Sequence, residues 1–134
     1  MQEQQPSMIR PLTSNDLEAA AQLTAGDPRT LLAHLRWQLH TPYASAFVLQ
    51  QGVALVGVAC SIRYSSSAHI GHVFIHPEHR RQGFGRALVQ HLINHCEANG
   101  CATMSTQAPE ADLGFWLAMG FNPQGQYIRY SGGL

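Results

Sequence analysis

The sequence has 134 residues, a hydrophobic fraction of 45%, and eight basic and eight acidic residues that give a formal net charge of zero. This size and composition predict one domain over residues 1–134 that buries a core without disulfides or a structural metal. The balanced charge argues against a nucleic-acid partner. No apolar run approaches the roughly 18 residues of a membrane span, and the first ten residues do not resemble a secretory signal. We therefore expect a cytoplasmic protein with no nucleic-acid or membrane partner.

The cysteines agree with a reducing compartment. Cys60, Cys96 and Cys101 include no CxxC pair. An odd number without such a pair is typical of reduced, mostly buried thiols, so small core residues are favoured over a catalytic cysteine. Six of the eight histidines fall between residues 69 and 95. Candidate reactive side chains therefore concentrate in that region.

The first half of the chain predicts a short strand, two helices and then three strands. A helix over 13–26 would be capped by Ser14 or Asn15 and ended by Gly26. A second, amphipathic helix over 27–40 starts with an Asp-Pro pair. The expected strands of this half cover 8–12, 44–50, 53–65 and 68–77, and the middle two meet at a turn around Gly52.

The second half continues with helix, strand, helix and an extended segment. The expected elements are a helix over 85–99, a strand over 101–106, a helix over 109–120 and an extended segment over 121–131 with a turn at Pro123–Gly125. This order predicts a mixed α/β domain. The run from 68 to 106 can form a parallel crossover, whereas the hairpin around Gly52 must be antiparallel, so the sheet should be mixed.

The segment IHPEHRRQGFGRAL (75–88) joins a predicted strand to a predicted helix. Glycines let a backbone approach a ligand closely, and the first turn of a helix has free N–H groups and positive potential. Together these features predict an anion site, most naturally for phosphate. A P-loop is excluded because no Gly-Lys-Ser/Thr follows. A dinucleotide fingerprint is disfavoured because Leu88 stands where a third glycine is needed.

Four segments resemble one known family. Arg80-x-x-Gly83-x-Gly85 resembles the Arg/Gln-x-x-Gly-x-Gly/Ala signature of the GNAT superfamily of acetyl-CoA-dependent N-acetyltransferases. The preceding IHP resembles the strand end before that signature, and IRPLTSNDLEAAAQL resembles the usual opening strand and helix. FWLAMGF (115–121) resembles a second signature, Phe-Tyr-x-x-x-Gly-Phe. The order and spacing of these segments fit the family over almost the whole chain.

The resemblance implies an α/β (α+β) fold in which a central mixed, mostly antiparallel sheet of about six to seven strands is splayed into a V and flanked by about four helices. It implies acetyl-CoA as co-substrate, held between the strands at 68–76 and 101–106. The strand end would pair with the pantetheine amides, as one strand pairs with another. The residues implied in cofactor binding are Val73, Phe74, Ile75, Arg80, Arg81, Gln82, Gly83, Phe84, Gly85, Arg86 and Trp116.

Acetyl transfer to an amine needs a base, because only the neutral amine attacks. His69 and His72 are the candidates, since an imidazole with a pKa near ~6.5 accepts protons at neutral pH. His69 falls where some family members carry Glu or His on this strand, so it ranks first. His72 lies on the opposite face of a regular strand, unless a bulge near Gly71 changes the alternation.

The chain departs from the family at three positions. Trp116 stands where the family usually has a Tyr that protonates the leaving thiolate; an indole cannot do this. Tyr127 or Tyr130 could replace it. Pro109 stands where many members have an Asn that contacts the cofactor. Members that acetylate protein N-termini often carry an acid where Met104 stands, which weakens that assignment of the acceptor.

Three alternatives follow. The main hypothesis is an N-acetyltransferase acting on a small-molecule amine or a peptide amine, as a monomer or homodimer. A non-catalytic acyl-CoA-binding sensor is the second, motivated by Trp116 and Pro109. A metal site at His91 and His95, spaced i, i+4, is the third, but it needs two further ligands, and histidines at the boundary of the core are favoured.

Overall fold

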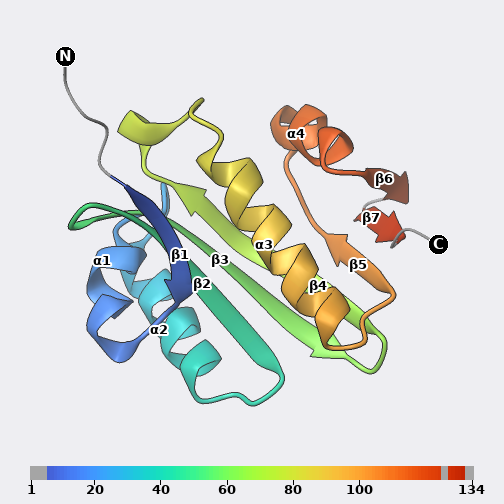
Figure 1. Cartoon of the computed structure of the whole chain (residues 1–134), viewed down its shortest axis with the longest axis horizontal. Helices are drawn as coiled ribbons and strands as arrows, with labels where there is room; N and C mark the ends of the chain where they lie inside the picture. Colours follow the sequence, from blue (N-terminus) through green and yellow to red (C-terminus); the bar gives the residue numbers. More distant parts are fainter. Residues whose placement is uncertain (1–5, 125–126, 132–134) are drawn as a thin grey trace.

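The computed structural model describes residues 6–124 and 127–131, with side chains described as far as Pro123. Its strands form one seven-stranded sheet in the order β1-β2-β3-β4-β5-β7-β6 (Figure 1). Among these described pairs β4–β5 is parallel and the others are antiparallel, so the predicted mixed sheet is confirmed. The strands are β1 (Ser7–Pro11), β2 (Ala44–Gln51), β3 (Ala54–Tyr64), β4 (Ser67–Ile75), β5 (Thr103–Thr106), β6 (Phe121–Gln124) and β7 (Tyr127–Ser131).

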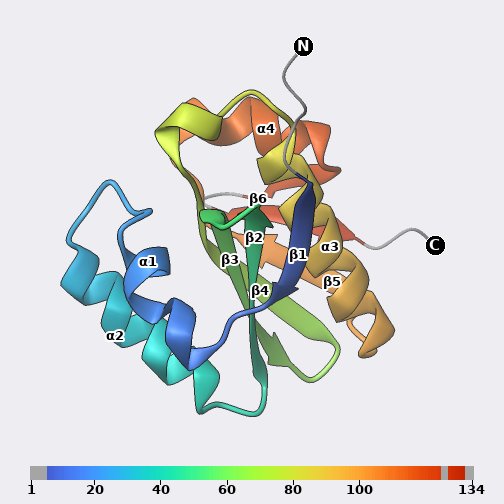
Figure 2. The same cartoon turned by 60° about the vertical axis from the view of Figure 1, so that its left-hand side comes forward.

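Helices cover both faces of the sheet. Figure 2 shows α1 and α2 on one side and α3 on the other. Each layer has its own core: Leu88 and Leu92 of α3 pack in one buried cluster, and Leu31 and Leu35 of α2 pack in the second. The helices are α1 (Leu17–Ala21), α2 (Pro28–Leu39), α3 (Phe84–Ala98) and α4 (Leu113–Ala118).

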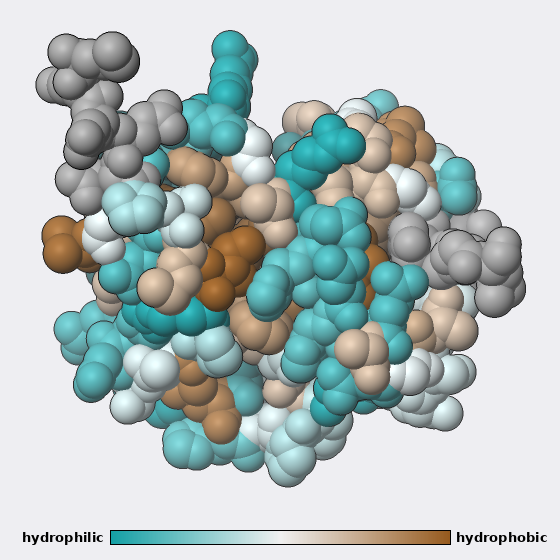
Figure 3. All heavy atoms as spheres, viewed as in Figure 1, coloured by the Kyte–Doolittle hydropathy of each residue, from teal (hydrophilic) through white to brown (hydrophobic). Residues whose placement is uncertain are grey.

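Helix α3 has the amphipathic pattern that the sequence predicts. Its buried residues recur at three- and four-residue spacing, which places them on one face of the helix. Its outer face is mainly hydrophilic (Figure 3). Within the described residues every helix is too short or too polar to cross a bilayer.

The first helix is shorter than predicted. A 3-10 turn at Ser14–Asp16 precedes α1, which ends at Ala21 and not at Gly26. The cap is Thr13, not Ser14 or Asn15, because Asp16 accepts hydrogen bonds from the Thr13 backbone N–H and hydroxyl at 2.8 and 2.9 Å. This capping box therefore sets the start of the first helical turn.

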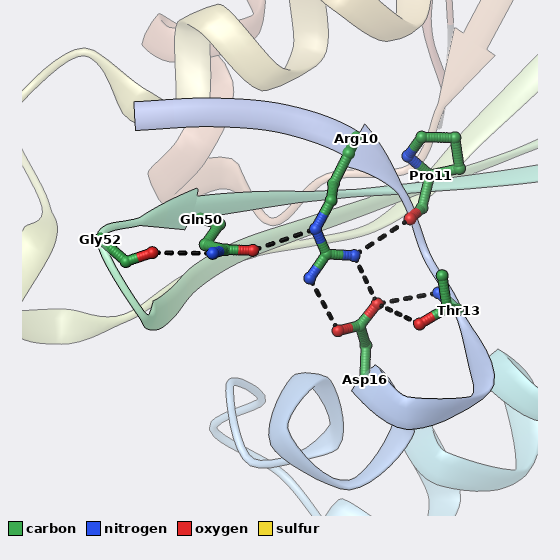
Figure 4. Close-up of polar contacts among 6 residues, drawn as sticks. All are labelled: Arg10, Pro11, Thr13, Asp16, Gln50 and Gly52. Atoms are coloured by element: carbon green, nitrogen blue, oxygen red, sulfur yellow. Dashed lines mark hydrogen bonds and ion pairs between the residues drawn. The ribbon is translucent and has the colours of Figure 1, made fainter. Parts of the chain in front are cut away.

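Asp16 also joins the helix to the sheet. Its two carboxylate oxygens accept bonds from the Arg10 guanidinium of β1 at 2.7 and 2.9 Å. Arg10 Nε donates to Gln50 Oε1 of β2 at 3.0 Å, and Gln50 Nε2 donates to the Gly52 carbonyl at 2.7 Å (Figure 4). One polar network therefore links β1, the first helical turn and the β2–β3 hairpin.

The end of the chain differs from the prediction in its turn. The extended segment divides into β6 and β7, which pair antiparallel. Pro123 lies within β6, so the turn does not begin there, and Gly125 lies outside the described residues. The hairpin around Gly52 is confirmed, with Gly52 at φ +60°.

Candidate functional site

The sheet opens between β4 and β5. The two strands pair from Ser67 to Ile70 on β4 and from Thr103 to Thr106 on β5. The rest of β4, residues 71–75, has no partner strand on that side within the described residues, and Figure 1 shows the two strands diverging there. Unpaired backbone N–H and C=O groups at a strand edge are a template for an extended ligand.

A β-bulge lies where the opening begins. Gly71 pairs with Cys60 and Phe74 pairs with Val58, so His72 and Val73 together oppose the single residue between them on β3. His72 adopts φ +52°. This left-handed conformation is uncommon outside glycine and costs on the order of 1 kcal/mol or more, so it marks a position worth explaining.

The bulge changes which face each side chain takes. Ala68 and Ile70 belong to the core under α3, and after the bulge Val73 and Ile75 pack against that same core. Without the extra residue these odd positions would lie on the opposite face. His72 is left on the α2 side, where its ring lies 4.8 Å from that of His34, measured between centroids. The condition under which His72 shares the face of His69 is therefore met.

The loop after β4 turns sharply into α3. Pro77–His79 form a 3-10 turn, Arg81 adopts φ +65°, and Gly83 is the helix N-cap at φ +80°. A Cβ at Gly83 would meet nothing within 4 Å, so only the backbone conformation requires glycine there. The first intrahelical bond runs from Ala87 N–H to the Gly83 carbonyl. The amides before it, in the first turn of α3, point out of the helix end and are available to an anion.

A cleft of about 910 Å³ joins these features. It is lined by the free end of β4, by the loop, by the start of α3 and by the segment between β5 and α4. Of the residues implied in cofactor binding, Gln82 and Phe84 do not line it; Phe84 packs against the core instead. The predicted residues that do line it are His72, Val73, Phe74, Ile75, Arg80, Arg81, Gly83, Gly85, Arg86 and Trp116.

The two candidate bases have different surroundings. His72 lines the cleft, whereas His69 does not. His69 Nδ1 lies 3.3 Å from Ser105 Oγ of β5, within hydrogen-bond distance. Burial lowers the pKa of both, and repulsion by any positive charge on His34 or His69 lowers the pKa of His72 further. Both imidazoles are therefore neutral at neutral pH and able to accept a proton.

The family departures have structural explanations. Trp116 is 5% exposed and lines the cleft. Its ring lies edge-on to those of Phe115 and Phe121, with centroids 5.1 and 5.0 Å away, so it forms an apolar wall of the cleft. Pro109 also lines the cleft. Met104 is 1% exposed in the core under α3, so a side chain at that position does not face the cleft. The absence of an acid at this position is unchanged, so the expectation drawn from it about the acceptor stays a prediction.

Several residues in or beside the cleft were not among the candidate catalytic and cofactor-binding residues. His79 lines the cleft, and its Nδ1 atom is buried with no hydrogen-bond partner among the described residues. Gln107 lines it from the segment after β5, and Ala25 from the loop between α1 and α2. His34 contacts His72 from α2. The proximity of His79 to the loop was the one available signal; the other three come together only through the fold.

The histidine pair on α3 has other partners. His95 Nε2 lies 2.9 Å from Ser45 Oγ, and the rings of His91 and His95 both lie edge-on to Phe47. Within the described part of the chain no three His, Cys, Asp or Glu side chains are placed to hold a metal ion. All three cysteines are free and buried, as expected.

The lining of the cleft has the chemistry that acetyl-CoA binding requires. Its open strand edge suits the amides of a pantetheine arm, and its loop and helix start suit phosphates. Arg80, Arg81 and Arg86 are exposed beside that end of the cleft. A Cβ at Gly85 would lie 3.5 Å from Ile75 and 3.7 Å from Phe115, an ordinary packing distance, so a larger side chain there would project into the space where the helix start meets the cleft.

Known proteins resemble this chain in sequence and in fold. The chain is 30% identical over 79 residues to [Ribosomal protein bS18]-alanine N-acetyltransferase of Escherichia coli K12, a match covering 57% of this chain and 53% of the relative. The chain thus spans about half the length of the curated relatives it matches. The crystal structure of the ribosomal-protein-S18-alanine N-acetyltransferase from Escherichia coli superposes with a TM-score of 0.80 at 21% identity, over 96% of both chains.

A second solved structure resembles the fold with its ligand present. A GNAT family acetyltransferase from Brucella melitensis in complex with acetyl-CoA gives a TM-score of 0.79 at 12% identity, over 97% of this chain and 90% of that one. The sequence pattern of the acetyltransferase (GNAT) family matches residues 12–121. Because this match covers most of the chain and the fold agrees, the chain belongs to the acetyltransferase (GNAT) family.

Proposed function

We propose that this chain transfers the acetyl group of acetyl-CoA to a primary amine by direct attack of the amine within a ternary complex. The observation that carries the proposal is the cleft at the divergence of β4 and β5, with the signature loop and the start of α3 at one end and His72 in its wall. Acetyl-CoA supplies a thioester whose C–S bond breaks as the new C–N bond forms.

Binding would use backbone more than side chain. The free edge of β4 at Val73–Ile75 would pair with the extended arm of the co-substrate. The amides of the loop and first helical turn would hold its pyrophosphate, with the three arginines adding positive potential. The same free edge offers N–H donors for the oxyanion that develops at the carbonyl. Trp116 would cover the arm as an apolar wall.

We propose His72 as the base that takes the proton from the acceptor ammonium. It lines the cleft, and its lowered pKa keeps it neutral and ready to accept a proton. His69 is the alternative base, although it lies outside the cleft lining and is hydrogen bonded to Ser105. With Trp116 in place of a titrating tyrosine, the CoA thiol would leave as a thiolate without help from that position. The side chains of Tyr127 and Tyr130 lie outside the described residues.

The proposed acceptor is a small-molecule amine or a peptide amine. The curated relative named above acts on the alanine of a ribosomal protein, so peptides that begin with alanine are the first acceptors to test.

Binding of acetyl-CoA is the first measurement. Calorimetric titration of the wild type should show binding, and an Arg81→Glu, Gly83→Asp variant should lose it, because two negative charges would face the phosphates. Arg36→Glu is the matched control, since Arg36 is exposed on α2 and absent from the cleft lining. No binding by a folded wild type would refute the proposal.

Turnover is the second measurement. Release of free CoA in the presence of an amine should fall in His72→Gln far more than in His69→Gln. Tight binding without CoA release, over small amines and alanine-initiated peptides, would favour the acyl-CoA sensor instead. A cytoplasmic location, one domain over the whole chain, and a monomeric or homodimeric state remain predictions; light scattering of the purified protein would measure the last.

A further inference from the structure

His72 occupies a position that the backbone alone would not favour. It sits at a β-bulge with φ +52°, and its ring lies at the edge of the cleft. A strained conformation persists where surrounding contacts hold it. The ring contacts that accompany it are with Phe74 on the same strand, at 6.4 Å between centroids, and with His34 at 4.8 Å.

His34 reaches this ring from another element. It projects from the middle of α2, a helix that packs on the opposite layer from α3, and its own side chain remains exposed. The two rings are tilted by 37° to one another. An imidazole at this distance can contact the His72 ring when neutral and repel it when both are protonated. Its exposure also means that replacing it removes little from the core.

The other groups facing His72 are few among the described residues. On its own strand His69 is the second titratable group that acts on it. From β3, Cys60 pairs with Gly71 and is buried with its thiol pKa raised to about 12, so it is uncharged. Ser105 of β5, which is bonded to His69, does not titrate in this range. After burial, the charged neighbours that act on the pKa of His72 are His34 and His69, and both lower it.

We propose that His34 is a positioning residue for His72: from α2 its ring holds the His72 imidazole against the cleft wall, and when His34 carries a proton it opposes a second proton on His72. The unprotonated ring nitrogen of His72 would then accept the proton of the acceptor ammonium. The neighbouring His34 ring would favour release of that proton from His72 after the transfer. The catalytic consequence rests on the proposed role of His72 as base. The pairing itself is a property of the ligand-free protein and is tested without turnover.

The test is an NMR titration of the histidine rings in the ligand-free protein, with the His72 signal assigned by its loss in His72→Gln. In His34→Gln the midpoint of His72 should move to higher pH, because a repelling neighbour is gone. In His34→Arg it should move to lower pH, because the neighbour is always charged. His40→Gln and His40→Arg are the matched controls: His40 is exposed at the end of the same helix. They should leave the midpoint in place.

Two outcomes would overturn the pairing. One is a His72 midpoint that is the same in wild type, His34→Gln and His34→Arg, with melting curves showing that all three fold. The other is equal movement in the His40 controls. Once an acceptor has been identified, kcat/KM can be measured as a function of pH. The midpoint of its acidic limb should move with the NMR midpoint of His72 in each variant. If the midpoint moves and the limb does not, the His34–His72 pair stands and the assignment of His72 as base fails.

Discussion

Replacing Asp16 with Asn should destabilise the fold in a pH-dependent way. Asp16 is 9% exposed and accepts two bonds from Arg10 and two from Thr13. The hydrogen bond from Arg10, followed by those from Thr13, lowers the pKa of Asp16 from 3.8 to about 2, against the opposing effect of burial. One unit corresponds to about 1.4 kcal/mol, which gives about 2 kcal/mol for the carboxylate. Because the Arg10 side chain is 29% exposed, water screens part of this, and we expect about 1–2 kcal/mol.

The sign follows from the lowered pKa in the folded state. The stabilisation is complete above the unfolded pKa near 4 and is lost as the pH falls toward 2. Urea unfolding should therefore show wild type and Asp16→Asn differing most at pH 7 and converging at low pH. Asp27→Asn is the control, since Asp27 bonds Arg29 on the surface at 3.3 Å, where that side chain is 90% exposed. A difference between wild type and Asp16→Asn that is as large at pH 2.5 as at pH 7 would show that packing, and not charge, causes it.

Three further changes probe the cleft and core. A Cβ at Gly57 would lie 2.7 Å from Ile75 and 3.3 Å from Leu88. Gly57→Ala should therefore lower the free energy of unfolding in urea by about 1–3 kcal/mol and weaken acetyl-CoA binding by displacing Ile75. An unchanged stability would mean that these side chains move aside without cost. Gly83→Ala has open space but φ +80°, so it should cost about 1–2 kcal/mol of stability and weaken binding, and equal binding would exclude a role for this loop conformation. Burial raises the pKa of Cys60 to about 12, so iodoacetamide at pH 8 should label it in urea and not in the native protein, as mass spectrometry would detect.

Local patterns were sufficient for most elements. The α3 helix was predicted within one residue at each end, because its apolar spacing and the flanking glycines are strong signals. Helix α1 was overestimated, since helix-compatible residues continue after Ala21 to the typical stop signal Gly26, whereas the helix ends at Ala21. Helix propensity alone does not determine where this helix ends; packing and capping do.

The residues of the candidate site also differ in how well the sequence predicts them. The loop is contiguous, so its glycines and arginines could be identified from spacing alone. His72 required knowledge of the bulge, which changes the face of every later residue of β4. The glycine at position 71 indicated where a bulge could form, but only the strand register shows that it does. His34 could not be assigned to the site, because an exposed histidine on an amphipathic helix looks like a solvated residue until the helix is placed against the sheet.

The divergence of β4 from β5 leaves an incomplete sheet inside the molecule. A ligand that pairs with the free edge at Gly71–Ile75 completes it, and in doing so favours the folded state over the unfolded one. At a ligand concentration about 100 times its Kd, this adds about 2.7 kcal/mol to the free energy of unfolding. Such an increment is a substantial share of the stability of an ordinary domain. The resistance of the purified protein to proteolysis should then rise with the concentration of the ligand that fills the gap.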